Sequence, residues 1–186
     1  MRRPTPDLEE ALHAARDGDA HGFAQLWRAL QPAVLRYLRV VVGDQAEDAA
    51  SETWLHVIRD LGRFHGDLDA FRGWLFRIAR HRALDLRRRR HGTPGTAVDG
   101  VAPDTATLAI EGFGTDWALR IIATLPADQA EAVMLRIVAG LDVATTAHIL
   151  GKRPGAIRIA TMRGLRRLAT HPQVSARTAP TPAGEV

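Results

Sequence analysis

The side chains best suited to charge-based recognition in this 186-residue chain are arginines, and they gather in two short stretches. Residues 80–90 hold six arginines against one aspartate, and residues 152–167 hold six basic residues and no acid. Residues 91–115, which lie between them, hold three acids and no lysine or arginine. Guanidinium groups pair well with phosphates, so two basic stretches indicate two contacts with a polyanion. Two solvated helix faces would give the same pattern.

The second basic stretch lies in a pattern typical of a helix-turn-helix. Asp142 can cap a helix over residues 143–150, Gly151 begins a turn, and Pro154 suits the first turn of a helix that runs to about residue 168. Apolar spacing assigns Ile157, Thr161, Leu165 and Leu168 to the core. The opposite face carries Arg158, Ile159, Met162, Arg163 and Arg166. Such a face fits the major groove of DNA, although an amphipathic surface helix is the simpler alternative.

Carboxylates cluster in a different part of the chain, at Asp44, Glu47, Asp48 and Glu52. Asp44 and Glu47 fit an N-cap and a capping box. The spacing of four between Asp44, Asp48 and Glu52 places them on one helix face, where like charges repel. A basic partner surface would relieve that repulsion, whereas capping and solubility alone would also account for Asp44 and Glu47.

Residue patterns for enzymatic chemistry are absent from the sequence. There is no cysteine, and the eight histidines form no H-E-x-x-H pattern. Gly151-Lys152 is not part of a phosphate-binding loop, and neither of the two serines lies in a nucleophile-like turn. We therefore expect no enzyme, no metal site and no cofactor.

The elements that must position these residues are all predicted to be helices. Periodicity predicts helices over residues 8–16, 23–38, 44–61, 69–90, 115–125, 126–140, 143–150 and 154–168. Pro32 should kink or break the second of them, and Asp69 can cap the fourth. The side chains expected to point inward include Trp27, Leu55, Ile58, Trp74 and Ile137. For Trp74 a stacking role remains open beside a core role.

Composition and charge complete the predicted organisation. The chain is 46% hydrophobic with a net charge of +4, and no apolar run approaches the roughly 20 residues of a membrane span. The start shows no signal peptide, so we expect a soluble, cytoplasmic protein. Residues 91–114 are rich in Gly, Pro, Ala and Thr and predict a flexible linker, and residues 172–186 predict a disordered tail. The expected fold is all-α, with two helical domains over residues 1–90 and 115–171.

Four segments resemble the extracytoplasmic-function (ECF) sigma factors of the bacterial sigma-70 family. The region 2 resemblance rests on DAASETW at residues 48–54 and on FRGWLFRIARHRALD at residues 71–85. The region 4 resemblance rests on LPADQAEAVMLRIVAGL at residues 125–141 and on ILGKRPGAIRIATMRGLRRL at residues 149–168. The segments follow the family's order, and the predicted linker lies where the family has its own.

The resemblance implies a function for each half. It implies that residues 1–90 bind core RNA polymerase and read and open the minus-10 element, and that residues 115–171 read the minus-35 element. The implied minus-10 contacts are Phe64, His65, Arg77, Arg80 and His81, with Phe64 as the wall of a base-capturing loop. The implied minus-35 contacts are Arg153, Arg158, Ile159, Met162 and Arg163. The implied polymerase-binding residues are Asp44, Glu47, Asp48 and Glu52.

Partners follow from the same resemblance: core RNA polymerase, promoter DNA and, for some members, an anti-sigma factor. Many members carry Asn at the position of His81 and Ser-Arg at Ile159-Ala160, so the sequence does not predict which bases are read. Two other functions stay open at this point. One is a stand-alone helix-turn-helix regulator that binds duplex half-sites as a dimer. The other is a small helical enzyme or scaffold whose basic patches bind an anionic substrate.

Overall fold

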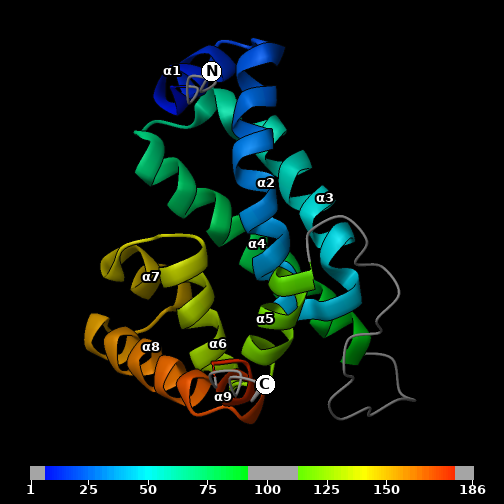
Figure 1. The fold of residues 1–186 in the computed structure, drawn as a ribbon. Helices are drawn as coiled ribbons and strands as arrows, with labels where there is room; N and C mark the ends of the chain where they lie inside the picture. The colour runs from blue at the N-terminus through cyan, green and yellow to red at the C-terminus, as the bar shows by residue number, and fades with distance from the viewer. Residues whose placement is uncertain (1–6, 92–112, 179–186) are drawn as a thin grey trace, which may run out of the picture.

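The computed structural model describes residues 7–91 and 113–178, and it is built from helices with no strand among those residues (Figure 1). The N-terminal half contains α1 (Leu8–Arg16), α2 (Ala20–Val42), α3 (Ala46–Asp60) and α4 (Leu68–His91), with 3-10 turns at Gly43–Gln45 and Leu61–Arg63. The C-terminal half contains α5 (Phe113–Ala123), α6 (Ala127–Val133), a π-helical turn (Met134–Val138), α7 (Val143–Leu150), α8 (Pro154–Ala169) and α9 (Pro172–Thr178). The all-α prediction is confirmed, and most of the expected linker lies outside the described residues.

The helix-turn-helix forms where its capping residues predict it. The side chain of Asp142 accepts a hydrogen bond from the backbone N–H of Thr145 at 2.8 Å and so caps α7. Gly151 ends α7 with φ +62°, a left-handed conformation that favours glycine. Pro154 occupies the first turn of α8, where its missing N–H costs no helical hydrogen bond.

Several predicted helix boundaries are wrong by a few residues. Asp44 lies inside a 3-10 turn rather than capping α3, because the chain tightens by one turn before that helix begins at Ala46. Asp67, not Asp69, caps α4 by accepting a hydrogen bond from the N–H of Ala70 at 2.8 Å. Helix α2 runs through Pro32 without a break. The predicted disordered tail is wrong for Pro172–Thr178, which form α9 against α8.

Two apolar residues predicted to point inward from α3 lie in solvent instead. Leu55 is 67% exposed and Ile58 is 57% exposed. The buried face of α3 is made by Ala49, Ala50, Thr53, Trp54 and Val57. Trp27 of α2 is also exposed. The small alanines let α3 pack closely, so the buried face turns toward them and away from the larger side chains.

The same correction applies to Ile137 and Leu165, which are exposed. The π-helical turn at Met134–Val138 adds one residue to a helical turn and rotates Ile137 out of the buried face. In α8 the core face consists of Ile157, Ala160 and Gly164 rather than Leu165. A Cβ built on Gly164 would lie 2.8 Å from a methyl of Val133, so glycine permits the close approach of α8 to α6.

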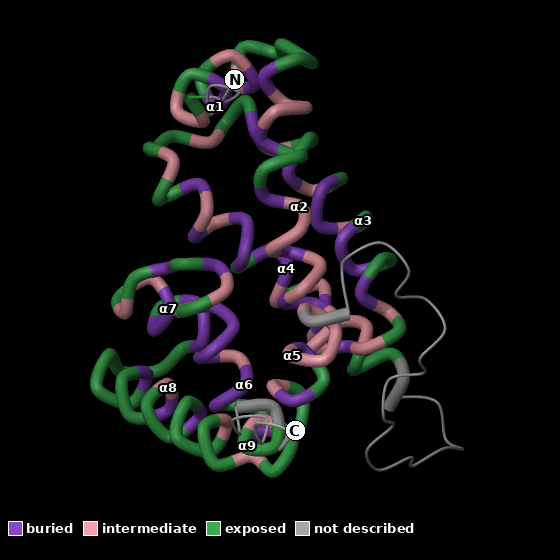
Figure 2. The backbone as a smooth tube through the Cα atoms, in the orientation of Figure 1, coloured by how far each residue is buried: buried purple, intermediate pink, exposed green. Residues whose placement is uncertain are grey.

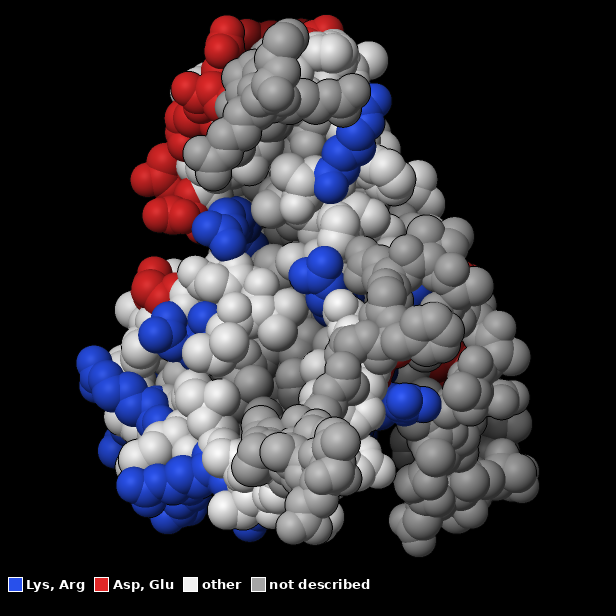
Figure 3. Space-filling model, viewed as in Figure 1, with Lys and Arg blue, Asp and Glu red and all other residues white. Residues whose placement is uncertain are grey.

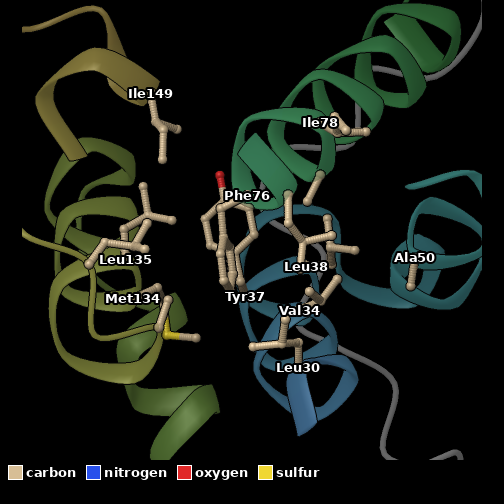
Figure 4. Close-up of a cluster of buried hydrophobic side chains, with 14 of the residues drawn as sticks. Leu30, Val34, Tyr37, Leu38, Ala50, Phe76, Ile78, Met134, Leu135 and Ile149 are labelled. Atoms are coloured by element: carbon tan, nitrogen blue, oxygen red, sulfur yellow. The ribbon is translucent and has the colours of Figure 1, made fainter. Parts of the chain in front are cut away.

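The two halves share one hydrophobic core. Tyr37 from α2 and Phe76 from α4 pack edge to face, with ring centroids 5.8 Å apart, and both side chains are fully buried. Figure 4 shows them between Leu38 on one side and the C-terminal pair Met134 and Leu135 on the other. Buried stretches occur in α2 and α4 of one half and in α6 and α7 of the other (Figure 2). The halves are therefore packed against each other in this structure.

Candidate nucleic-acid interface

The outer face of α8 presents the residues predicted to read the minus-35 element. Arg153, Arg158, Ile159, Met162 and Arg163 are all exposed. In Figure 3 a band of Lys and Arg side chains lies over α8 at the lower left of the view. Helix α7 is anchored by Asp142, whose pKa is held below its usual value chiefly by the hydrogen bond from the Thr145 backbone. A rigid, capped α7 thus fixes an exposed, cationic α8, as major-groove insertion requires.

The loop before α4 brings three aromatic rings together. Phe64 stacks on Trp74 with ring centroids 5.1 Å apart and meets Phe71 edge to face at 5.6 Å. Phe64 and Trp74 are half-buried, and His65, Gly66 and Asp67 are exposed. Trp74 therefore packs in this aromatic cluster, with one ring face against Phe64. The loop has an apolar wall with polar groups at its rim.

The structure divides the three basic residues predicted to follow that loop. His81 is exposed. Arg77 lies 3.3 Å from the Nε2 of His148 on α7. Arg80 donates from its Nε to a carboxylate oxygen of Glu131 on α6 at 2.7 Å. Arg80 is thus engaged by the C-terminal half, whereas Arg77 contacts that half through His148 but stays exposed.

The Arg80–Glu131 pair is a largely enclosed ion pair between the halves. The side chains of Arg80 and Glu131 are only 21% and 12% exposed. The buried hydroxyl of Tyr37 donates to the same carboxylate oxygen at 3.2 Å. Burial first, and then the negative charge of Glu131, raise the pKa of Tyr37, so the phenol stays protonated as a donor.

Two further contacts hold α4 against the C-terminal half. Arg72 donates to the backbone carbonyl of Ala139 at 2.5 Å. A Cβ built on Gly73 would lie 2.8 Å from the methyl of Thr145 on α7, so the two helices approach as closely as a glycine allows. These contacts join segments more than sixty residues apart in the sequence, which explains why no local pattern predicts them.

The acidic residues predicted to bind the polymerase lie around the start of α3. Asp44, Glu47 and Asp48 are exposed, while Glu52 is half-buried. Glu47 lies 3.8 Å from Arg39, and Glu52 lies 3.7 Å from Arg89. The exposed Leu55, which is not among the residues predicted to bind polymerase, continues the Asp48–Glu52 face at helical spacing. The surface therefore combines carboxylates with an apolar edge, as protein interfaces commonly do.

A histidine cluster links α3 to the arginine-rich part of α4. The Nδ1 of His56 accepts hydrogen bonds from Arg82 at 3.0 Å and Arg59 at 3.2 Å, and its Nε2 lies 3.1 Å from the carboxylate of Asp60. Burial, followed by the charge of Arg59, lowers the pKa of His56 from its ordinary 6.5. A neutral ring with a bare Nδ1 is the form that both arginines require.

Within residues 7–91 and 113–178, no group of three His, Cys, Asp or Glu side chains could hold a metal ion. Over the same residues, no helix has the length and apolar character needed to cross a bilayer.

Comparison with known proteins gives matches to both halves. The family model described as Sigma-70 region 2 matches residues 26–93, and that described as Sigma-70, region 4 matches residues 115–168. The chain is 34% identical over 175 residues to the ECF RNA polymerase sigma factor ShbA of Streptomyces griseus, covering 84% of this chain and 91% of that protein. It is also 34% identical over 181 residues to the ECF RNA polymerase sigma factor BldN of Streptomyces coelicolor, covering 90% of this chain and 69% of that one.

A solved structure is similar along most of its length. The sigma factor RpoE of Bartonella quintana, crystallised in complex with the anti-sigma factor NepR, has a TM-score of 0.62 and 25% sequence identity. The match covers 79% of this chain and 94% of that chain.

Proposed function

The chain belongs to the ECF sigma factors of the sigma-70 family, and we propose that three surfaces described above divide the work of such a factor among them. It is an RNA polymerase sigma factor that binds core polymerase and directs promoter-specific initiation. We assign residues 1–90 to polymerase binding and the minus-10 element, residues 91–114 to the linker, and residues 115–171 to the minus-35 element. The protein acts in the cytoplasm with polymerase and carries out no catalysis of its own.

The minus-35 element is assigned to the outer face of α8. Arg158 and Arg163 lie about 1.4 turns apart on α8, and both are exposed. Guanidinium groups in the major groove pair with guanine edges and phosphates, and the exposed Ile159 offers a methyl-sized apolar contact. The exposed cationic face of α8, held by a capped α7, is the observation that carries the proposed function.

The minus-10 element is assigned to the loop at residues 64–67 and to the adjacent face of α4. Capturing a base from the duplex costs a few kcal/mol of stacking, which an aromatic wall and hydrogen-bonding groups at its rim offset. Phe64 is assigned to the wall, and the exposed His65 and His81 are assigned to contacts with the strand. Arg77 and Arg80 are assigned to phosphates of the same strand once they are released from His148 and Glu131.

The two DNA surfaces cannot serve one promoter in the packed arrangement. Elements at minus-10 and minus-35 are centred about 25 base pairs apart, or about 85 Å at 3.4 Å per base pair. A packed chain of this length has a radius of gyration of about 16 Å and is therefore only about 40 Å across. We infer that the halves separate on the polymerase and that the packed structure is the closed form.

Polymerase docking is assigned to the face of α3 that carries Asp48, Glu52 and Leu55, together with Asp44 and Glu47 at its start. The carboxylates fit a basic partner surface, and the apolar edge supplies surface that is removed from water on binding. An anti-sigma factor, the kind of partner present in the Bartonella quintana complex, is a further candidate partner.

The test is reconstituted transcription with core polymerase on genomic fragments, followed by mapping of the start sites. A sigma factor should redirect core polymerase to a set of starts that share two sequence elements. If the protein binds duplex operators tightly by itself as a dimer and leaves polymerase unaffected, it is instead a stand-alone regulator. Turnover of a small anionic substrate without polymerase would support an enzyme.

A further inference from the structure

Helix α1 contacts both ends of the loop at residues 64–67. A carboxylate oxygen of Glu9 accepts a hydrogen bond from the backbone N–H of Leu68, the first residue of α4, at 3.0 Å. The guanidinium of Arg16 lies 3.3 Å from the Nδ1 of His65. Figure 1 shows α1 beside the connection between α3 and α4. Apolar residues of α1, Ala11 and Leu12, are buried in the core beneath these two polar contacts.

The loop is also fixed from its inner side. The ring of Phe64 stacks on Trp74, and a Cβ built on Gly66 would lie 2.9 Å from the edge of the Phe64 ring. Asp67 caps α4 through the N–H of Ala70. Only the outer rim, formed by His65, Gly66 and Asp67, remains exposed. With Glu9 and Arg16 at its ends, the loop has little freedom to change its backbone.

We propose that Glu9 and Arg16 are positioning residues that set the geometry of the base-capturing loop from outside the region 2 segment. This inference rests on the proposed assignment of that loop to the minus-10 element. The matched region 2 segment starts at residue 26, so the family comparison assigns nothing to α1. Capture of one base over another depends on pocket atoms being held to within about half an ångström. A charged carboxylate on the Leu68 N–H and a guanidinium on the His65 ring supply that constraint.

The test measures base discrimination rather than total activity. Initiation by core polymerase with the full chain is compared on a mapped promoter and on templates with each minus-10 base replaced in turn. The informative position is the one at which His65→Ala changes the ratio of initiation on the original template to initiation on the template with the replaced base. At that position we expect Glu9→Ala to lower the ratio by about tenfold, the scale of one lost charge-assisted hydrogen bond. Glu9→Gln keeps an acceptor and should retain the ratio.

Two other variants complete the experiment. Glu10→Ala removes the same charge from an exposed neighbour on the same helix and should change nothing. Arg16→Ala removes the guanidinium that contacts the His65 ring and should also lower the ratio at the position that His65 reads.

The outcomes separate two kinds of failure. If Glu9→Ala and Arg16→Ala reduce thermal stability or total initiation while the ratio stays constant, α1 is merely structural and the inference is overturned. If neither His65→Ala nor Phe64→Ala changes the ratio at any minus-10 position, the assignment of the loop itself is wrong.

Discussion

Replacing Glu131 by glutamine should open the packed arrangement. The change keeps the side chain's shape but removes its charge, and it leaves the guanidinium of Arg80 partly buried without a counter-ion. Removing one partner of a fully buried ion pair costs about 3–5 kcal/mol. The Arg80 and Glu131 side chains are 21% and 12% exposed, so we expect the change to destabilise the closed form by about 2 kcal/mol relative to the open form. That difference raises the ratio of open to closed molecules about thirtyfold.

The opening can be measured as a distance between the halves. The natural chain has no cysteine, so labels can be attached at Ser51→Cys on α3 and Ala156→Cys on α8 without removing any other thiol. Both positions are exposed. Pulsed electron paramagnetic resonance on the free protein should show one short distance for the parent and an added long, broad population for Glu131→Gln.

The unlabelled variant provides a second measurement, because opening precedes full engagement of polymerase and promoter. The apparent Kd of a partner is inversely proportional to the fraction of binding-competent molecules, so Glu131→Gln should tighten promoter binding in the presence of core polymerase. Asp128→Asn is the matched control, since Asp128 lies on the same helix but pairs with Lys152 of its own half at 3.6 Å. If Glu131→Gln leaves both the distances and the apparent Kd like those of Asp128→Asn, the ion pair does not hold the halves together.

Four further changes test other parts of the structure. Gly73→Ala places a methyl against Thr145 and should raise the ratio of open to closed molecules about tenfold in the same distance measurement. Adding Thr145→Ser removes the facing methyl and should restore the closed form. Arg158→Ala should lower initiation about tenfold on a promoter with its minus-35 element, and unchanged initiation there would remove α8 from that contact. Asp48→Lys should weaken core polymerase binding about tenfold at low salt and less at high salt, as titrations at two salt concentrations would show. For His56, the pKa is lower in the folded than in the unfolded protein, so the unfolded state binds the proton more readily and stability is lost as the pH falls through about 6.5. Thermal midpoints at about pH 7.5 and pH 5.5 should therefore differ less for His56→Gln than for the parent, and an equal difference would contradict the tautomer described above.

The helix-turn-helix is the part of the fold that the sequence predicts best, because its signals are local. Asp142, Gly151 and Pro154 act within a few residues of themselves through a cap, a left-handed turn and a fixed φ. The outward set on α8 follows from the same short-range periodicity, except that Leu165 is exposed. Gly164 permits helix contact at that point, and a glycine gives no apolar signal in the sequence.

Features that depend on contacts between the halves could not be predicted in the same way. Arg80 and Glu131 are 51 residues apart, and each alone has the appearance of an ordinary surface charge. The assignment of Arg80 to DNA therefore missed its partner in the closed form. Leu55 was expected in the core because it is apolar, whereas the packing of alanines turned α3 the other way. The roles assigned to these residues remain predictions that the experiments above address.

The shared core of Tyr37, Phe76, Met134 and Leu135 has a consequence for exchanging parts between relatives. A chimaera that joins the first half of this chain to the second half of another sigma factor would place unmatched side chains against Tyr37 and Phe76. Its closed form would be loosened even if both DNA surfaces were intact, and the hybrid would engage polymerase more readily than either parent. Modular grafting of promoter specificity therefore has to carry the facing residues of α6 and the π-helical turn together with α8.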